Sequence, residues 1–392
     1  ACLIEDSRYC RFTRNHVRVR EIPESEPQAR RMHWIRITGE DTHHNRIDHN
    51  LLEEKQNGGV MIYTAGSGEE TGNQAARYNR IDHNHFRNFH RGQGNGFETI
   101  RLGTSTYSHS SAYTIIEYNL FERCNGEAEI ISIKTCNNTI RHNTFRNSRG
   151  MLTLRNTHDC LVEGNYFFND GSEQDSSGVR FYGQGHVIIN NYFEGLGEAA
   201  VIIRTGDIER RTEPKWKYEA KGSGLGDYGD YQRPEKTLIA FNTIVNCEVA
   251  FDLGGSEELV NRYPLPARDI TVANNLVLSD RKQVNRDLGH WERFAFEGNL
   301  FFSTASEASL GWNLPAESFR WTDPRLERRD GLMVPESDSP VRDTASGNYP
   351  LVTRDIQGQT RPAKKDVGAD EISKDKQVFM PLNSRDVGPQ AL

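Results

Sequence analysis

The sequence predicts an all-β fold, a parallel β-helix with a C-terminal capping segment. Three observations predict it: a motif centred on asparagine recurs along the chain, its basic spacing lies in the low twenties, and apolar residues flank each asparagine. The mean hydropathy of −0.73 and the 35% of hydrophobic residues are low for one thick globular core. They suit an elongated molecule whose core is a thin column.

The repeat is clearest in the hexapeptide Asn-Arg-Ile-Asp-His-Asn, which occurs at residues 45–50 and 79–84. From Asn119 onward, looser versions return after 24, 22 and 26 residues. A period of this size with short β-branched runs is typical of a solenoid, and the leucine scaffold of leucine-rich repeats is absent. We expect each Asn to take a left-handed conformation at a tight corner and to bond to the Asn of the next coil. The preceding Ile and the following Phe should point inward and stack.

The asparagine rhythm also divides the chain. Residues 1–303 keep it, and we assign them to the β-helix and its groove. Within them, residues 205–236 read as an inserted loop, because they are rich in charge and glycine. Residues 304–392 lose the rhythm, and we expect a C-terminal cap and tail packed on the helix end, where edge backbone would otherwise be unpaired.

Composition excludes several classes of protein. The net charge of −7 argues against a nucleic-acid partner, since such proteins are usually basic. No apolar run approaches the length of a membrane span. The six cysteines show no CxxC spacing, which argues against a zinc site.

A row of cations shares the phase of the repeat. Four coils carry a cation nine to eleven residues before their Asn, once a loop at 104–111 is set aside, and a fifth cation ends a similar strand. These residues are Arg101, Lys134, Arg155, Arg180 and Arg204. Strand alternation places each cation outside, and stacked like charges are costly unless an anion lies along them. We interpret the row as a groove for a polyanion, with a solvated face and scattered counter-ions as the alternative.

Carboxylates accompany this row. Glu127 and Glu129 precede Lys134, and their i, i+2 spacing puts both on one strand face. The same phase count places Asn95 above Glu127 on the neighbouring coil. Two carboxylates and an amide oxygen are ligands of the kind that Ca²⁺ takes. The alternative is that the glutamates simply neutralise the cations.

Four stretches together resemble polysaccharide lyase family 6, the alginate lyases and chondroitinase B. They are Asn95-Gly-Phe-Glu-Thr-Ile-Arg-Leu-Gly-Thr-Ser105, Glu127-Ala-Glu-Ile-Ile-Ser-Ile-Lys134-Thr-Cys, Gly150-Met-Leu-Thr-Leu-Arg155 and Val187-Ile-Ile-Asn-Asn-Tyr-Phe-Glu-Gly195. The resemblance runs from about residue 10 to the end of the β-helix. Asn156 and Thr157 depart from it, because His-Gly usually follows the arginine of the third stretch.

The resemblance implies a right-handed parallel β-helix that cleaves alginate by β-elimination. It implies that Asn95, Glu127 and Glu129 bind Ca²⁺, that Lys134 is the general base and that Arg155 is the general acid. It also implies a periplasmic or secreted location, and we expect a monomer or a homodimer. Substrate contacts are expected from the remaining groove residues, Arg101, Arg180, Arg204, Tyr182 and His186.

Three alternatives remain open at this point. The first is a lyase for dermatan or chondroitin sulfate. The second is a mannuronan epimerase on a similar β-helix, which abstracts the same proton but releases no unsaturated product. The third is a non-catalytic β-helix that binds polysaccharide.

Five histidines form a further group: His43, His44, His49, His83 and His85. Their spacing follows the coil repeat, so we interpret them as stacked polar positions near the asparagine row rather than as a metal site.

Overall fold

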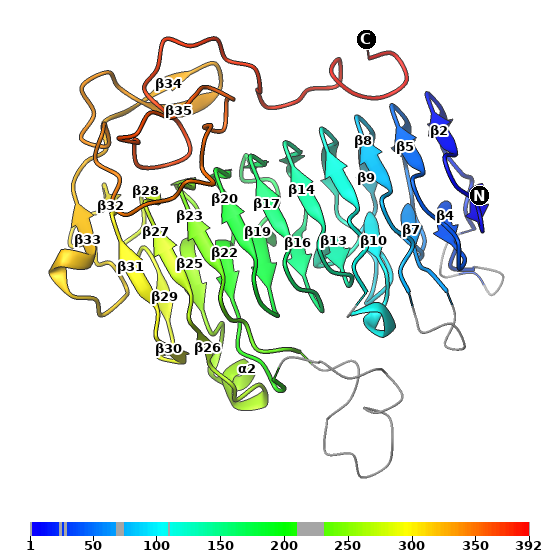
Figure 1. Cartoon of the computed structure of the whole chain (residues 1–392), viewed down its shortest axis with the longest axis horizontal. Helices are drawn as coiled ribbons and strands as arrows, with labels where there is room; N and C mark the ends of the chain where they lie inside the picture. The colour runs from blue at the N-terminus through cyan, green and yellow to red at the C-terminus, as the bar shows by residue number, and fades with distance from the viewer. Residues whose placement is uncertain are drawn as a thin grey trace.

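The computed structural model describes residues 2–22, 26, 30–67, 74–108, 110–209 and 231–391. The chain winds as a right-handed parallel β-helix, as the sequence predicts. Its coils stack into a column built from three long parallel sheets, and each sheet takes about every third strand (Figure 1). No helix in these ranges is long and apolar enough to cross a membrane.

The three sheets run the length of the column. The first sheet contains β1 (Cys2–Glu5), β4 (Ile35–Thr38), β7 (Ile62–Thr64), β10 (Ile100–Leu102), β13 (Glu129–Ile133), β16 (Gly150–Leu154), β19 (Ser176–Phe181), β22 (Ala199–Ile203), β25 (Val249–Leu253) and β29 (Arg286–Asp287). The second contains β2 (Arg11–Thr13), β5 (Arg46–Asp48), β8 (Arg80–Asp82), β11 (Ile115–Glu117), β14 (Thr139–Arg141), β17 (Leu161–Glu163), β20 (Val187–Ile189), β23 (Leu238–Ala240), β27 (Thr271–Ala273) and β31 (Ala295–Glu297). The third contains β3 (His16–Val17), β6 (Leu51–Glu53), β9 (His85–Phe89), β12 (Leu120–Cys124), β15 (Thr144–Arg146), β18 (Tyr166–Phe168), β21 (Tyr192–Glu194), β24 (Thr243–Val245), β28 (Leu276–Ser279), β32 (Asn299–Ser303) and β33 (Phe319–Trp321).

Shorter elements lie outside these sheets. They are the helix α2 (Glu257–Arg262), the 3₁₀ turns η2 (Ser105–Tyr107) and η3 (Ala316–Ser318), the strand pair β26 (Ala267–Arg268) and β30 (Trp291–Glu292), and the antiparallel hairpin β34 (Leu326–Arg329) and β35 (Leu332–Pro335). Helix α2 begins after Ser256, whose side chain accepts a hydrogen bond from the backbone N–H of Leu259.

A ladder of buried asparagines joins the second and third sheets at their shared corner. Its members are Asn50, Asn84, Asn119, Asn143, Asn165, Asn191, Asn242, Asn275 and Asn299. Each side-chain amide donates to the Oδ1 of the next member at 2.9–3.0 Å. The left-handed residue is the one before each Asn, for example His83 and His142 at φ 52°. The expectation that the Asn itself takes this conformation is therefore wrong, because its role is to satisfy backbone groups at the corner.

Apolar residues on both sides of the ladder fill the column. The Phe residues two positions after successive ladder asparagines stack with ring centroids 4.4–4.9 Å apart. The Ile or Val residues three positions before the ladder, such as Ile116 and Val162, are fully buried. These stacks repeat the same apolar contact in every coil, which gives the thin core that the composition suggested.

Removing one ladder asparagine should destabilise the whole column. The Asn143 side chain makes five hydrogen bonds, two accepted from Asn119 and one donated to each of Ile116 O, Arg141 O and Asn165 Oδ1. We expect Asn143→Ala to lower the free energy of unfolding by about 2–4 kcal/mol, since buried partners lose their bonds. Thermal unfolding measures this, with the exposed Asn348→Ala as control. Equal melting temperatures for the two variants would contradict it.

The C-terminal segment differs from a simple end cap. Leu310, Trp312 and Phe319 do pack into the core at the last coils. The chain then returns along the side of the column toward the first coils (Figure 1). Gly388 N donates to His83 O at 2.8 Å, and Arg14 Nη1 donates to Ala391 O at 2.8 Å. The segment therefore ties the two ends of the solenoid together as well as covering one of them.

Candidate active site

The predicted cations lie on the outer face of the first sheet, but they form two columns rather than one. The register from β10 to β19 aligns Arg101 and Arg180 with each other. Lys134, Arg155 and Arg204 each follow the last residue of β13, β16 and β22, two positions further along the same face. Residue counting from the asparagine ladder merged the columns, because the corner between the first and second sheets varies by a residue and the offsets of nine to eleven residues span two outward positions.

Lys134 is the most deeply placed cation of the second column. Its side chain is buried, with 9% of the residue exposed. Burial lowers the pKa of Lys134 below its usual value, and the positive charges of Arg155 and Arg101 lower it further, while Glu129 and Glu98 oppose this. A lysine in this environment supplies a neutral amine more readily than one in solvent.

Glu129 organises the charges around Lys134. Its Oε1 lies 2.5 Å from Arg180 Nη2 and 3.9 Å from Arg155 Nε. Burial alone would raise the pKa of Glu129, but Arg180, Arg155 and Lys134 hold it below its usual value. This carboxylate therefore stays ionised and fixes both guanidinium groups beside the lysine.

Two tyrosines flank Arg155. Arg155 Nη2 donates to the Tyr231 hydroxyl at 2.8 Å, and the guanidinium lies 4.8 Å from the centre of that ring. The rings of Tyr182 and Tyr231 lie 4.5 Å apart. Tyr182 therefore lies beside Tyr231 at this site, and its contact with substrate stays a prediction. Sequence reasoning gave Tyr231 no role, because the inserted loop does not follow the asparagine repeat.

The acidic group at the site contains one residue that sequence reasoning missed. Carboxylate oxygens of Glu98, Glu127 and Glu129 lie within 4.8 Å of one another. Burial, Glu98 and Glu129 raise the pKa of Glu127 to about 8. In the described part of the chain, the buried Oε2 of Glu98 has no hydrogen-bond partner. The available signal was its position three residues before Arg101, to which its Oε1 bonds at 3.3 Å.

This acidic group fits a hard cation. Three clustered carboxylates, an orphaned buried oxygen and a strongly raised pKa all indicate an excess of negative charge that a divalent ion would relieve. Asn95, the predicted amide ligand, is exposed on the adjoining turn, where its backbone oxygen accepts from Arg31. The next residue, Gly96, donates its N–H to Glu127 Oε2 at 3.0 Å, so the turn itself contacts the group.

Of the other predicted substrate residues, Arg101 and Arg204 lie on the outer face of the first sheet, whereas His186 does not. Arg101 lies at one side, 4.8 Å above the ring of Tyr63. Arg204 lies at the other side in a cleft of about 470 Å³ and pairs with Asp252 at 2.9 Å. His186 is fully buried, and its two ring nitrogens contact Cys160 N and Tyr182 O. The prediction that His186 lines a subsite is therefore wrong, because its ring points into the column.

The residues after Arg155 are structural in this fold. Asn156 and Thr157 are fully buried. Thr157 Oγ1 donates to Thr135 O at 2.5 Å, and Asn156 Nδ2 contacts Ser105 Oγ at 3.3 Å. They attach the corner after Arg155 to the preceding coil and to the turn η2.

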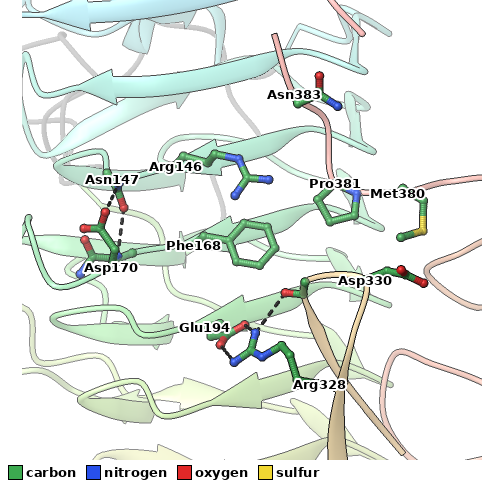
Figure 2. A pocket seen from close by; sticks show the side chains of 12 residues that line it. Arg146, Asn147, Phe168, Asp170, Glu194, Arg328, Asp330, Met380, Pro381 and Asn383 are labelled. Carbon is green, nitrogen blue, oxygen red and sulfur yellow. Dashed lines mark hydrogen bonds and ion pairs between the residues drawn. The ribbon is translucent and has the colours of Figure 1, made fainter. Parts of the chain in front are cut away.

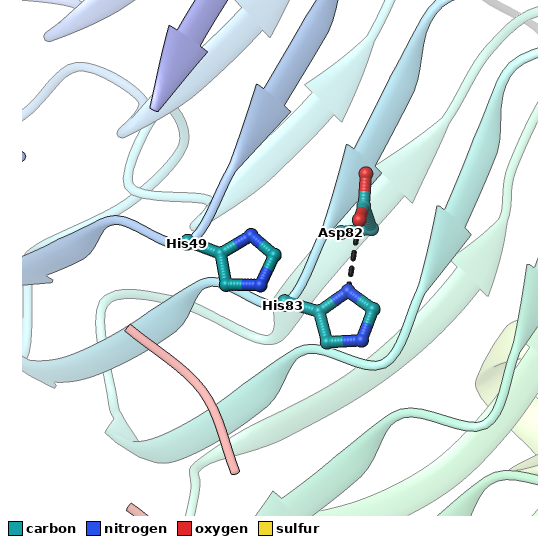
Figure 3. A group of neighbouring side chains, drawn as sticks. All are labelled: His49, Asp82 and His83. Atoms are coloured by element: carbon teal, nitrogen blue, oxygen red, sulfur yellow. Dashed lines mark hydrogen bonds and ion pairs between the residues drawn. The ribbon is translucent and has the colours of Figure 1, made fainter. Parts of the chain in front are cut away.

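A second group of potential ligands lies at the ladder corner, away from the first sheet. Figure 3 shows His49 and His83 parallel to each other, with Asp82 bonded to His83. The rings lie 4.8 Å apart at an interplanar angle of 2°, and the His83 Nδ1–Asp82 Oδ2 distance is 2.8 Å. Parallel stacked rings direct their free nitrogens side by side rather than toward one ion. This agrees with the prediction of stacked polar positions.

Comparisons with known proteins converge on one group. A family model described as Chondroitinase B matches residues 4–307. A mannuronic acid specific polysaccharide family 6 lyase from human gut microbiota is 28% identical, with a TM-score of 0.66 over 83% of this chain and 68% of that one. The family 6 alginate lyase AlyGC is 26% identical, with a TM-score of 0.64 over 95% of this chain. This chain spans 45% of AlyGC, less than half of its length.

A more distant structure agrees in fold. The family 6 polysaccharide lyase of Pseudopedobacter saltans is 21% identical, with a TM-score of 0.60 over 100% of this chain and 80% of that one. No curated protein matches the chain.

Proposed function

The chain belongs to the chondroitinase B family, polysaccharide lyase family 6, and from that premise we propose that it cleaves alginate by Ca²⁺-dependent β-elimination. The observation that carries the proposal is the buried Lys134 with its lowered pKa, set beside Arg155 and the acidic group Glu98, Glu127 and Glu129. A lysine base needs this kind of environment, because only its neutral form accepts a proton.

In the proposed reaction, Lys134 removes the proton on C5 of a uronate, next to the sugar carboxylate. The C5–H electrons form a C4–C5 double bond, and the C4–O bond to the neighbouring sugar breaks. The departing oxygen takes up one proton, supplied by Arg155, as the C4–O bond breaks. Lys134 releases the C5 proton to solvent, from which Arg155 regains its own. The elimination therefore consumes no water and leaves an unsaturated sugar at the new chain end. Arg101 and Arg180 lie on the same face, three strand spacings apart, and can pair with carboxylates of different sugars along one polymer chain.

Arg155 is proposed to stabilise the departing C4 oxygen. Its contacts with Glu129 and with the Tyr231 hydroxyl hold the guanidinium in place before substrate binds. Positioning of this kind lowers the cost of organising charge during the reaction.

Glu98, Glu127 and Glu129 would hold the metal ion, with oxygen ligands from the substrate or water completing its shell. When bound, Ca²⁺ supplies positive charge that stabilises the sugar carboxylate as C5 loses its proton. Asn95 remains a proposed ligand, because its turn already contacts Glu127 through Gly96.

Alginate is favoured as substrate because the solved relatives at 26–28% identity are described as lyases for mannuronic acid or alginate. Dermatan sulfate is the second candidate, since the matching family model is named for chondroitinase B. Both polymers carry uronate carboxylates, which the cation columns fit.

A panel of polymers tests the proposal. With Ca²⁺ present, we expect the ultraviolet absorbance of unsaturated ends to rise with polymannuronate or polyguluronate and to stay flat with dermatan sulfate. Mass spectrometry of the products should show eliminated rather than hydrolysed sugars. A rise with dermatan sulfate alone would identify the second candidate. Binding without cleavage, or altered uronate stereochemistry without unsaturated ends, would overturn the lyase proposal.

A further inference from the structure

A second cleft lies on the third sheet, on a different side of the column from the acidic group. It has a volume of about 500 Å³. One wall is the outer face of β15, β18 and β21, where Arg146, Phe168 and Glu194 stand in register on successive coils. The opposite wall comes from hairpin β34–β35 and from residues 380–383 of the returning C-terminal segment (Figure 2). We call it the side cleft.

Arg146 is the distinctive residue of the side cleft. Its guanidinium lies 4.7 Å from the centre of the Phe168 ring, and Figure 2 shows it directed into the space beside Pro381. Burial lowers the pKa of Arg146 below its usual value, and the charge of Glu122 offsets this only in part. Leu382 O accepts a long hydrogen bond of 3.4 Å from it.

The two carboxylates in register with Arg146 on the third sheet are bound elsewhere, and Asp170 and Asp330, which also line the cleft, form no ion pair with it in the described part of the chain. Glu122, one coil before Arg146, pairs with His85 at 2.6 Å. Glu194, two coils after it, pairs with Arg328 and accepts from the Tyr192 hydroxyl. Within the described residues, no carboxylate lies within 4 Å of the Arg146 guanidinium. A half-buried positive charge left in this state is costly, and an incoming anion would compensate it.

The lining of the cleft indicates what kind of anion fits. Asn147, Asn169 and Asn383 also line the cleft. Their amides bond to neighbouring protein groups, and each retains a further donor or acceptor position for a hydroxyl group. The planar guanidinium suits a carboxylate, and the volume is in the range of small-ligand sites. A ligand with one carboxylate and several hydroxyls matches this combination.

We propose that the side cleft is a second carbohydrate site, which binds a uronate unit of an acidic polysaccharide through Arg146. The identity of the sugar rests on the proposed function, whereas the absence of an ion-pair partner for Arg146 among the described residues does not. A polymer held at this site and at the first sheet would gain from two attachments to one protein. The site would thus raise retention of long chains without contacting the reacting atoms.

The test follows the Arg146 side chain directly. The full chain carrying Lys134→Met, which blocks turnover, is labelled with isotopically enriched arginine for NMR. The Nε–H signal that disappears in the Arg146→Gln variant is assigned to Arg146. Saturated trimannuronate or triguluronate should shift this signal, and maltotriose should not. Acetate should bind at least about tenfold more weakly, because it lacks the hydroxyl contacts.

Arg87→Gln in the same background is the matched control. Arg87 lies on β9 of the same sheet but pairs with Glu53 at 2.6 Å, so its loss should leave the Arg146 shift unchanged. An unmoved Arg146 signal with either trimer, or equal binding of acetate, overturns the inference. The result is separable from the lyase proposal: unsaturated product from the wild type with an unmoved Arg146 signal defeats the inference alone. A moved signal without product defeats the lyase proposal alone.

Discussion

Replacing Lys134 by alanine or methionine should lower the rate of unsaturated product formation by about 10²–10⁴-fold, the range typical of a lost general base. The fold should survive, because Lys134 stands at the end of β13 on the outer face of the sheet and not in the apolar column. Initial rates on the best alginate block measure the effect, and melting temperature checks the fold.

The pH profile gives an independent test of the same role. Burial, Arg155 and Arg101 lower the pKa of Lys134, so the neutral amine should become populated below the ordinary lysine range. Activity should therefore rise with pH along a limb that reports this group, and Lys134→Ala should lose the limb. Arg204→Gln is the matched loss of a cation from the same column outside the immediate charge group, and we expect that variant to keep the limb. A Lys134→Ala enzyme with the wild-type rate and limb would remove lysine from the mechanism.

The fold could be predicted from the sequence because its signal is periodic. Each ladder asparagine satisfies the same backbone groups in every coil, so the requirement recurs and can be counted. The detail that failed was the left-handed residue, which is His, Tyr, Gly, Phe or Asn at different coils. Residue type does not identify that position because the ladder, one residue later, already fixes the corner.

The site could be predicted less completely, and the reasons are local. Counting from the ladder found Lys134 and Arg155 but missed that Arg101 and Arg180 occupy a separate column. The corner between the first and second sheets varies by a residue, so offsets of nine to eleven residues do not separate two outward positions. Tyr231 approaches Arg155 from the inserted loop, and such a long-range contact leaves no periodic trace.

Two further errors came from side-chain direction. His186 follows Arg180 closely in sequence, yet it lies past the corner with its ring inside the column. Glu98 faces the acidic group, although no role followed from its place in the motif. Direction depends on where each strand ends, and the sequence places those ends only to within a residue or two.

Removing Ca²⁺ by thorough chelation should lower the rate on alginate by at least about 100-fold, because the carboxylate of the substrate would then lack its main source of stabilising charge. Glu127→Gln should weaken Ca²⁺ binding by at least about tenfold, since a charged ligand is lost from the group. Calorimetric titration with Ca²⁺ and rates after re-addition of the ion measure both effects. Full activity in the chelated enzyme would exclude a metal role.

The metal-free protein should show the same carboxylates through its pH stability. Burial, Glu98 and Glu129 raise the pKa of Glu127 to about 8 in the folded chain, above its unfolded value. The folded state therefore holds the proton more tightly, and stability from this group is lost as pH rises from about 4.5 to 8. Ca²⁺ should then raise the melting temperature more at pH 8 than at pH 5, because it competes with fewer protons.

Glu127→Gln should remove both the loss of stability at high pH and the stabilisation by Ca²⁺. It removes a repelling charge from the acidic group, so the metal-free variant should be more stable than the wild type at pH 8 while gaining little from Ca²⁺. Glu163→Gln is the control, since Glu163 on β17 also has a pKa raised by burial but lies outside the acidic group. That variant should keep the full Ca²⁺ shift. If Glu127→Gln gains as much from Ca²⁺ as the wild type does, the ion binds elsewhere and the assignment of these glutamates fails.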